Sequence, residues 1–450
     1  MENNDSFDFE FNDDEGCWSV TGYYGKAEEI ILPAFYEGMP VKKIGDMFSP
    51  YNKRMKNVII PKGFTSIGKR AFKGCTGLTS VKLPESITSI EEWAFCGCTG
   101  LTSIKLPESL TSIETYAFSN CTGLTNIKLP DGLTSVEDWA FNECTGLTNI
   151  KLPGSLTSIR HWAFPGCPGL AGITVDENNS VFCALDGVMF DKAMTMLMWF
   201  PEGKKGGYSV PDGVMRIISD AFMVSNLTSI SFPQSLISIE SSEFNGDQLT
   251  DITVNELNPE YCSIDGVLFD KEKKKLLAYP KNKDKTDYTV PDGIRLINSC
   301  AFNGCKHLVN IHLPESLELI GDCAFTECEG LKAITLPMNL QYVQENAFQD
   351  CQNLETITLS KRTKIIWDQF LAGLYGRKRL VYINLPESPE LIGDFMFAER
   401  EGNKTITLPM NLRYVEERTF EDFTIPLSRG RDVTWDTAFE GFTGQLIYRD

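Results

Sequence analysis

Histidine is scarce in this sequence, and its scarcity limits the chemistry that the chain can perform. Only three histidines occur, His161, His307 and His312. None of them lies in a metalloprotease motif, and the sequence contains neither a nucleophile-elbow motif nor a phosphate-binding loop. Because these motifs place the reactive groups of common hydrolases and nucleotide-dependent enzymes, we expect no catalytic residue and no cofactor. The sequence favours a protein that is not an enzyme.

Positive charge and long apolar runs are missing as well. The chain has 42 Lys and Arg against 61 Asp and Glu, which gives a net charge of −19. An acidic chain repels phosphate backbones, so we expect no nucleic-acid partner. No run of about 18 apolar residues occurs, so we expect no membrane insertion. Residues 1–10 lack the basic start and apolar core of a signal peptide, which leaves a cytoplasmic location open.

A repeated pattern of 23 residues organises the chain. Its four most regular copies begin at Leu78, Leu101, Leu124 and Leu147, and the last ends at Gly169. A fixed period of this length is typical of a stacked solenoid, and the leucine spacing is typical of a leucine-rich repeat. Each turn of a solenoid is buried only against its neighbours, so a single long domain is expected.

The order of residues within one copy predicts where its side chains point. In the copy over residues 101–123, Ile104 and Leu106 alternate with polar residues, as on a strand with one face in the core. Pro107 has no N–H to donate and ends that strand. A second extended segment over residues 110–113 returns to the core. The rest forms short turns, or 3₁₀ or helical segments, so we expect a mostly β solenoid.

Regular repeats alternate with less regular segments along the chain. We expect an acidic tail over 1–16, a capping repeat over 17–55, regular repeats over 56–170, a β-hairpin insertion over 171–207, repeats over 208–250, a second β-hairpin insertion over 251–287, repeats over 288–425 that degenerate after 360, and a C-terminal cap over 426–450. The hairpins are predicted from Asp186-Gly187 and Asp265-Gly266, because Asp-Gly between apolar runs is a strong hairpin signal. Phe7, Phe9 and Phe11 alternate with acidic residues, which leaves open a short interaction strand or a strand that caps the core.

The repeat unit Leu-x-x-Ile-x-Leu-Pro-x-x-Leu-x-x-Ile-x-x-x-Ala-Phe-x-x-Cys resembles the BspA-like, or Treponema-type, leucine-rich repeat. The segments around Asp186-Gly187-Val188 and Asp265-Gly266-Val267 resemble interruptions that are common in that family, and so does the entry over residues 41–45. The resemblance extends over about residues 18–442. It implies a curved solenoid with a concave sheet and no catalytic site. It also implies a microbial surface or secreted protein that adheres to host, matrix or other cell-surface proteins.

Cysteine is abundant, with 14 residues. Eight of them share one repeat position: Cys75, Cys98, Cys121, Cys144, Cys167, Cys305, Cys328 and Cys351. Such a ladder predicts small, buried, reduced side chains. Cys300 and Cys323 add a second thiol to two adjacent turns, where a zinc site or a disulfide is the alternative. Because the spacing matches no common zinc motif, we expect no metal.

The predicted concave face carries a row of lysines. The row and its polar flanks consist of Ser80, Lys82, Ser103, Lys105, Asn126, Lys128, Asn149 and Lys151. Adjacent like charges repel, so local stability does not explain the row, and an acidic partner could bind there. The alternative is a solvated row whose charges are neutralised by Glu85, Glu108 and Asp131, three residues further on.

A column of aromatic residues precedes the repeat phenylalanines by two positions: Trp93, Tyr116, Trp139 and Trp162. Exposed aromatic rows bind proteins or stack on sugar rings. The alternative is a stacked column that stiffens the convex side. Taken with the lysine row, the column favours a non-catalytic scaffold that binds a protein through its concave sheet and lateral surface. A carbohydrate-binding module, an effector and an intracellular or self-associating scaffold stay open as alternatives.

Overall fold

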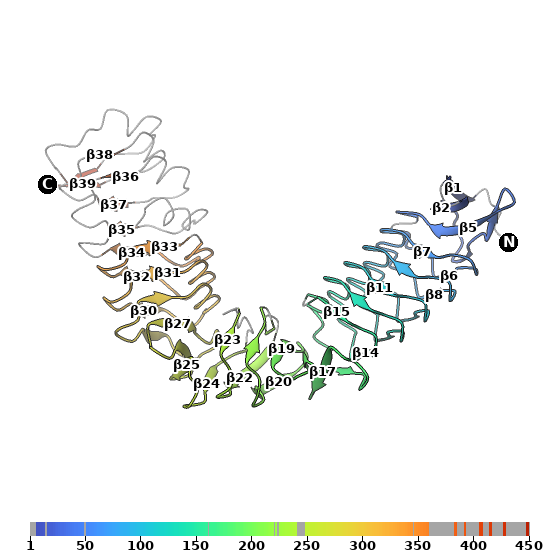
Figure 1. The fold of residues 1–450 in the computed structure, drawn as a ribbon. Coiled ribbons are helices and arrows are strands. Elements are labelled where there is room, and N and C mark those ends of the chain that lie inside the picture. Colours follow the sequence, from blue (N-terminus) through green and yellow to red (C-terminus); the bar gives the residue numbers. More distant parts are fainter. Residues whose placement is uncertain are drawn as a thin grey trace. The chain divides into compact units, whose positions relative to one another are not determined.

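The computed structural model of the chain is a β-solenoid with turns of about 23 residues (Figure 1). It describes residues 6–13, 16–48, 51–160, 162–219, 221–222, 225–240, 248–344 and 346–359, and beyond residue 359 only the backbone of short strands. The chain divides into two compact units. The first comprises Met1–Lys205 and Val214–Asn226, and the second Gly206–Gly213 and Leu227–Asp450. The solenoid predicted from the 23-residue period is confirmed.

Each turn of the first unit contributes a strand to each of two ladders. The first ladder consists of β3 (Glu29–Ile31), β6 (Asn57–Ile59), β8 (Ser80–Lys82), β10 (Ser103–Lys105), β12 (Asn126–Lys128), β14 (Ile150–Leu152) and β16 (Ile173–Val175). The second consists of β1 (Phe7–Asn12), β2 (Cys17–Tyr23), β5 (Met39–Ile44), β7 (Ser66–Ile67), β9 (Ser89–Ile90), β11 (Ser112–Ile113), β13 (Ser135–Val136) and β15 (Ser158–Ile159), with β4 (Phe35–Tyr36) beside β5. From β5 onward the second ladder is parallel, and equivalent residues of successive turns pair with each other, as Ser112 does with Ser135.

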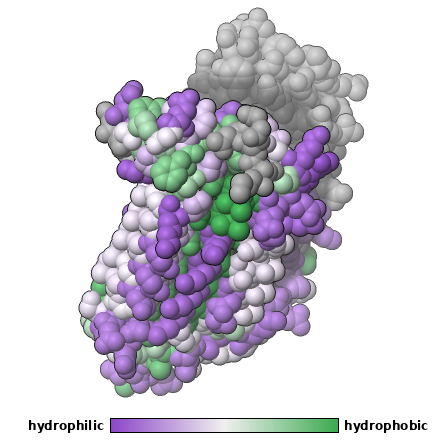
Figure 2. All heavy atoms as spheres, turned by 90° about the vertical axis from the view of Figure 1, so that its right-hand side faces the viewer, coloured by the Kyte–Doolittle hydropathy of each residue, from purple (hydrophilic) through white to green (hydrophobic). Residues whose placement is uncertain are grey.

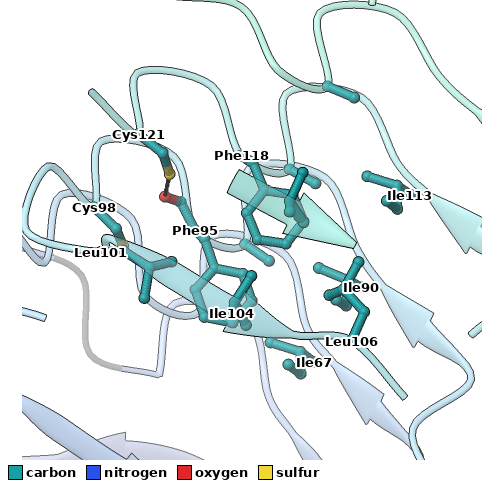
Figure 3. Packing of buried hydrophobic residues seen from close by; sticks show 14 of the residues in the cluster. Ile67, Ile90, Phe95, Cys98, Leu101, Ile104, Leu106, Ile113, Phe118 and Cys121 are labelled. Atoms are coloured by element: carbon teal, nitrogen blue, oxygen red, sulfur yellow. Dashed lines mark hydrogen bonds between the residues drawn. The ribbon is translucent and has the colours of Figure 1, made fainter. Parts of the chain in front are cut away.

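The core lies between the two ladders, where the alternation of the sequence directs the apolar side chains. Ile104 and Leu106 are buried, whereas Lys105 between them is exposed. Phe118 is fully buried, and its ring stacks on that of Phe95, with the centroids 5.3 Å apart (Figure 3). On the other side it stacks 5.6 Å from the ring of Phe141. The repeat phenylalanines therefore form one continuous column along the stack.

Turns close the remaining side of the stack. No α-helix occurs in the described residues, so this side consists of turns, one of the forms expected from the sequence. Neighbouring turns approach closely here, because a Cβ at Gly123 would collide with the Thr99 carbonyl oxygen of the preceding turn. Glycine at that position is what allows the turns to stack.

The N-terminal segment departs from the expected acidic tail. Residues 7–12 form β1, which pairs antiparallel with β2 at the end of the second ladder. Phe7 is buried, with its ring 5.1 Å from that of Tyr23, while Asp8 and Glu10 point to solvent. The tail expected over 1–16 therefore contains a strand that covers the end of the core, because its alternating phenylalanines bury one face.

Both predicted hairpin insertions are confirmed. The first consists of β17 (Phe182–Leu185), β18 (Val188–Asp191) and β19 (Met196–Trp199), and the second of β25 (Tyr261–Ile264), β26 (Val267–Asp270) and β27 (Lys275–Ala278). Asp186 and Gly187 connect the first pair of strands with φ of 49° and 81°, and Asp265 and Gly266 connect the second with 48° and 72°. Positive φ at both residues is what a tight two-residue hairpin turn requires. In each insertion the third strand then pairs parallel with a strand of the next turn: β19 with β21 (Arg216–Ile217), and β27 with β29 (Leu296–Ile297).

The second unit repeats the two-ladder plan. Its strands are β20 (Lys205–Ser209), β22 (Asn226–Phe232), β24 (Asp251–Val254), β28 (Asp287–Thr289), β30 (Asn310–His312), β32 (Ala333–Leu336) and β34 (Thr356–Leu359) on one side, and β23 (Ser238–Ile239), β29, β31 (Leu319–Ile320) and β33 (Tyr342–Val343) on the other. Phe302, Phe325 and Phe348 form a column of stacked rings within the second unit, with centroids 5.1 and 5.2 Å apart.

Beyond residue 359 the structure describes the backbone of six strands: β35 (Tyr382–Asn384), β36 (Leu391–Ile392), β37 (Thr405–Thr407), β38 (Tyr414–Val415), β39 (Pro426–Ser428) and β40 (Ile447–Arg449). β35 pairs in parallel with β34 and β37, which continues the ladder. The predicted degenerate repeats after 360 and the predicted cap over 426–450 otherwise lie outside the described residues.

Candidate functional site

The lysine row and its polar flanks form one exposed face on the first ladder of the first unit. We call this surface the lysine face; it consists of Ser80, Lys82, Ser103, Lys105, Asn126, Lys128, Asn149 and Lys151, and all eight side chains are exposed. Buried neighbours on the same strands, such as Ile104 and Ile127, fix the direction in which the polar residues point. Lys105 pairs directly with Lys128, so the backbone positions of these lysines repeat at the strand spacing, roughly 4.7–4.9 Å.

Carboxylates of neighbouring turns form ion pairs with this row. Lys105 Nζ lies 3.5 Å from Glu85 Oε1, and Lys128 Nζ lies 3.6 Å from Glu108 Oε1. Each acid thus pairs with the lysine of the following turn rather than with the lysine three residues before it. Lys151 Nζ lies 2.8 Å from Asp176 Oδ2, and this hydrogen bond raises the pKa of Lys151 and lowers that of Asp176.

The same carboxylates also bind the backbone of the next turn. The Glu108 N–H donates to Glu85 Oε2 at 3.0 Å, and the Asp131 N–H donates to Glu108 Oε2 at 2.9 Å. Backbone N–H groups of the following turn therefore hold the Glu85 and Glu108 carboxylates in place. The lysines extend further into solvent, with 86% of the Lys105 side chain and 78% of the Lys128 side chain exposed.

The four residues of the aromatic column stack on one another and are half-buried. The ring centroids of Trp93 and Tyr116 are 4.1 Å apart, those of Tyr116 and Trp139 are 5.8 Å apart, and those of Trp139 and Trp162 are 4.9 Å apart. The ammonium of Lys73 lies 4.0 Å from the Trp93 ring centroid. Neighbouring groups therefore occupy the ring faces inside the column, and mainly the ring edges stay accessible.

The backbone of this column is strained. Trp93, Tyr116 and Trp139 have φ of 64°, 59° and 61°, in the left-handed region that bulky residues rarely adopt. Stacking of the rings and the cation–π contact of Lys73 offset part of that cost. This conformation was not predicted from the sequence, because the equivalent position in other turns holds chemically unrelated residues, among them Arg70, Cys300 and Cys323.

The cysteine ladder bridges successive turns through hydrogen bonds. The thiol of Cys121 donates to the Phe95 carbonyl oxygen at 3.2 Å, and that of Cys144 donates to the Phe118 carbonyl oxygen at 3.2 Å. Burial raises the pKa of Cys75 to about 12 and that of Cys167 to about 12. All 14 cysteines are thiols in the structure, and those of the ladder are buried. Among the described residues, no group of three or more His, Cys, Asp or Glu side chains is arranged to hold a metal ion.

Two buried asparagines and a shallow cleft were not predicted from the sequence. Asn179 and Asn258, one in each insertion, are buried, and their amides bond backbone groups of the preceding turn and of the hairpin. An asparagine at the same position of both insertions was the one feature of the sequence that could have indicated this role. A shallow cleft lies over β30 and β32 beside His312 and Glu315.

The N-terminal end of the first unit also exposes apolar side chains, among them Tyr24, Phe35 and Tyr51. Figure 2, which views the molecule from this side, shows apolar surface between hydrophilic side chains. Nothing in the repeat pattern marks these residues as exposed, since they lie in the irregular first turns.

A comparison with known protein families identifies the same repeat. The family model described as the BspA type leucine rich repeat region, in 6 copies, matches residues 42–180, 207–275, 277–376 and 372–428. The chain belongs to this family. No curated protein matches the sequence.

Several solved structures resemble the chain. A leucine rich cell surface protein from Faecalibacterium prausnitzii A2-165 is 24% identical, with 84% of this chain and 93% of that chain covered and a TM-score of 0.46. A leucine-rich repeat protein from Bacteroides ovatus is 22% identical, with 86% and 94% covered and a TM-score of 0.45. The pneumococcal vaccine antigen PcpA is 18% identical, with 100% and 98% covered and a TM-score of 0.45. Within the described part of this chain, no helix has the length and apolar character of a membrane span.

Proposed function

We propose that this BspA-type repeat protein is a non-catalytic scaffold that binds an acidic surface of another protein through the lysine face. The observation that carries the proposal is the arrangement of eight exposed polar side chains on one ladder, four of them lysines in register. Buried neighbours hold the strands in place, so the face is preorganised. The backbone of such a face loses little conformational entropy when a partner binds, so that cost falls mainly on the lysine side chains.

The energetics of the row favour binding over a purely structural role. Ion pairs as long and exposed as Lys105–Glu85 and Lys128–Glu108 each contribute about 0–1 kcal/mol. Like charges directly opposite each other on neighbouring strands destabilise a sheet. The lysines therefore add little to the stability of the fold. An acidic partner replaces weak, solvated ion pairs with a complementary field, and it would be attracted more strongly at low salt.

The aromatic column supports a protein partner rather than a carbohydrate. A sugar ring stacks on a free aromatic face, whereas the inner faces of this column are occupied by neighbouring rings and Lys73 covers Trp93. In our proposal the column stiffens the stack and offers ring edges to a partner. The family resemblance supports a partner on host cells, in the matrix or on other cells, and a surface or secreted location.

A charge-matched pair of variants tests the proposal. The first replaces Lys82, Lys105, Lys128 and Lys151 by Ser. The control replaces four exposed lysines of the second insertion by Ser: Lys271, Lys273, Lys274 and Lys275. Binding to immobilised matrix proteins and to cultured host cells is measured at two salt concentrations. We expect at least a tenfold loss of affinity and a weaker salt dependence for the first variant only. Equal affinity of both variants would show that the lysine face does not bind the partner.

A further inference from the structure

The position that holds the aromatic column in the first unit holds two cysteines in the second unit. Cys300 and Cys323 have φ of 56° and 53°, the same left-handed conformation as Trp93 and Tyr116. Both cysteines are half-buried, whereas Cys305 and Cys328 of the cysteine ladder are only 1% and 0% exposed. Two partly exposed cysteines therefore lie at one repeat position on adjacent turns.

Backbone hydrogen bonds put the two cysteines in register. The Cys300 N–H donates to the Asp322 carbonyl oxygen at 2.9 Å, and the Phe302 N–H donates to the Ala324 carbonyl oxygen at 2.8 Å. These bonds join two successive turns, and the repeat of 23 residues places Cys300 beside Cys323. The equivalent bond from Trp93 to Thr115, at 3.1 Å, accompanies a separation of 4.1 Å between the Trp93 and Tyr116 rings. Side chains at this position therefore project in the same direction from adjacent turns.

This spacing suits a disulfide. Cys300 and Cys323 lie in turns, and backbone hydrogen bonds hold these turns at about the spacing of neighbouring strands, roughly 4.7–4.9 Å. The Cα atoms of bridged cysteines lie roughly 4.4–6.8 Å apart. The Cβ atoms must approach by about 1 Å, to roughly 3.8 Å, and the side chains must rotate so that the sulfur atoms bond. A surface turn allows that movement more readily than the core does.

We propose that Cys300 and Cys323 form a redox-modification site, a dithiol that small-molecule disulfides oxidise to one disulfide across two adjacent turns. The thiolate of one cysteine attacks the S–S bond of oxidised glutathione, which forms a mixed disulfide and releases one glutathione thiolate. The second cysteine then attacks the protein sulfur of that mixed disulfide and releases the second glutathione. Two protein thiols are oxidised, one glutathione disulfide is reduced to two thiols, and the two protons pass to solvent or to the leaving thiolates.

The buried ladder is excluded from this reaction. The thiol of Cys328 donates to the Phe302 carbonyl oxygen at 3.1 Å, and burial raises the pKa of Cys328 well above that of an ordinary thiol. Both effects suppress the thiolate, which is the attacking form. Oxidation should therefore select the two half-buried cysteines over their buried neighbours five residues on.

Peptide mapping of the full chain tests the proposal. The reduced protein is incubated natively with oxidised glutathione, remaining thiols are alkylated, and the denatured protein is digested with trypsin. Cleavage after Arg295, Lys306 and Lys332 separates the two cysteines, and fragmentation of the linked peptides identifies the bonded pair. We expect a Cys300–Cys323 link that dithiothreitol reverses, with Cys305 and Cys328 alkylated only after denaturation.

Two variants sharpen the result. Cys300→Ser should leave a glutathione adduct on Cys323 and no link, and Cys262→Ser, which removes another half-buried cysteine, should leave the link intact. Circular dichroism establishes that both variants fold. The proposal is overturned if the wild-type protein carries separate adducts on Cys300 and Cys323, links Cys300 to Cys305, or stays fully reduced at this pair while Cys183 and Cys262 react.

Discussion

Phe118 offers the sharpest test of the packing that holds the stack together. Its side chain is fully buried, and its ring contacts those of Phe95 and Phe141 in the turns on either side. Phe118→Ala removes the ring but keeps the backbone carbonyl that accepts the thiol hydrogen bond of Cys144. Replacing a core phenylalanine by alanine costs about 3–5 kcal/mol. We expect the upper half of that range, because stacked turns on both sides prevent the cavity from closing.

Urea denaturation followed by circular dichroism measures this cost. Long repeat arrays lose cooperativity, so hydrogen exchange of the amides in residues 95–141 provides a second, local measure of stability. Phe35→Ala, at an exposed phenylalanine, is the matched control and should change the free energy of unfolding by less than about 0.5 kcal/mol. A cost below about 1 kcal/mol for Phe118→Ala would refute the column of stacked rings as a stabilising element.

Two further substitutions test polar elements of the first unit. Asn179→Ala leaves the Pro153 and Leu156 carbonyls and two hairpin N–H groups without their amide partner, so it should lower the free energy of unfolding by about 3 kcal/mol. Asn178→Ala, at the exposed neighbour, is the control and should lower it little. Equal losses for the two variants in urea denaturation would refute the role of Asn179. Burial, followed by the charge of Asp46, raises the pKa of Glu91 from 4.5, so the ionised carboxylate destabilises the folded state above both its folded and unfolded pKa values. Glu91→Gln should therefore stabilise the protein at pH 7, with a gain reduced by the partial solvation of the carboxylate, and the gain should vanish as the pH falls below 4.5. Thermal unfolding across this pH range measures the difference, and a gain that grows toward low pH would contradict the assignment.

The elements predicted correctly from the sequence are those with short-range signals. The 23-residue period and the alternation around Ile104 indicate the strands and the core directly, since stacking repeats the same contacts in every turn. The Asp-Gly pairs indicate both hairpins, because few residues accept positive φ at two successive positions. Repetition thus turns a local pattern into a prediction of tertiary structure.

The elements that were missed depend on contacts between distant or irregular segments. The amide of Asn179 donates hydrogen bonds to the carbonyl oxygens of Pro153 and Leu156, more than 20 residues earlier in the chain. No local sequence pattern predicts contacts between residues that far apart in sequence. The acidic residues of β1 suggested a solvated tail, yet burial of Phe7 outweighs the cost of placing two exposed acids on a strand. The lysine face is visible in the sequence as a row, but its cross-turn ion pairs depend on how successive turns stack.

The central claim, that the lysine face binds the partner, is tested most directly by crosslinking from defined positions. A photoreactive amino acid replaces Ser103 on the lysine face in one variant and the exposed Thr111 beside the second ladder in another. After both variants bind to cultured host cells or immobilised matrix proteins, illumination records which position touches the partner. We predict crosslinks from position 103 that high salt abolishes, and few from position 111. Crosslinks from position 111 alone would contradict the claim.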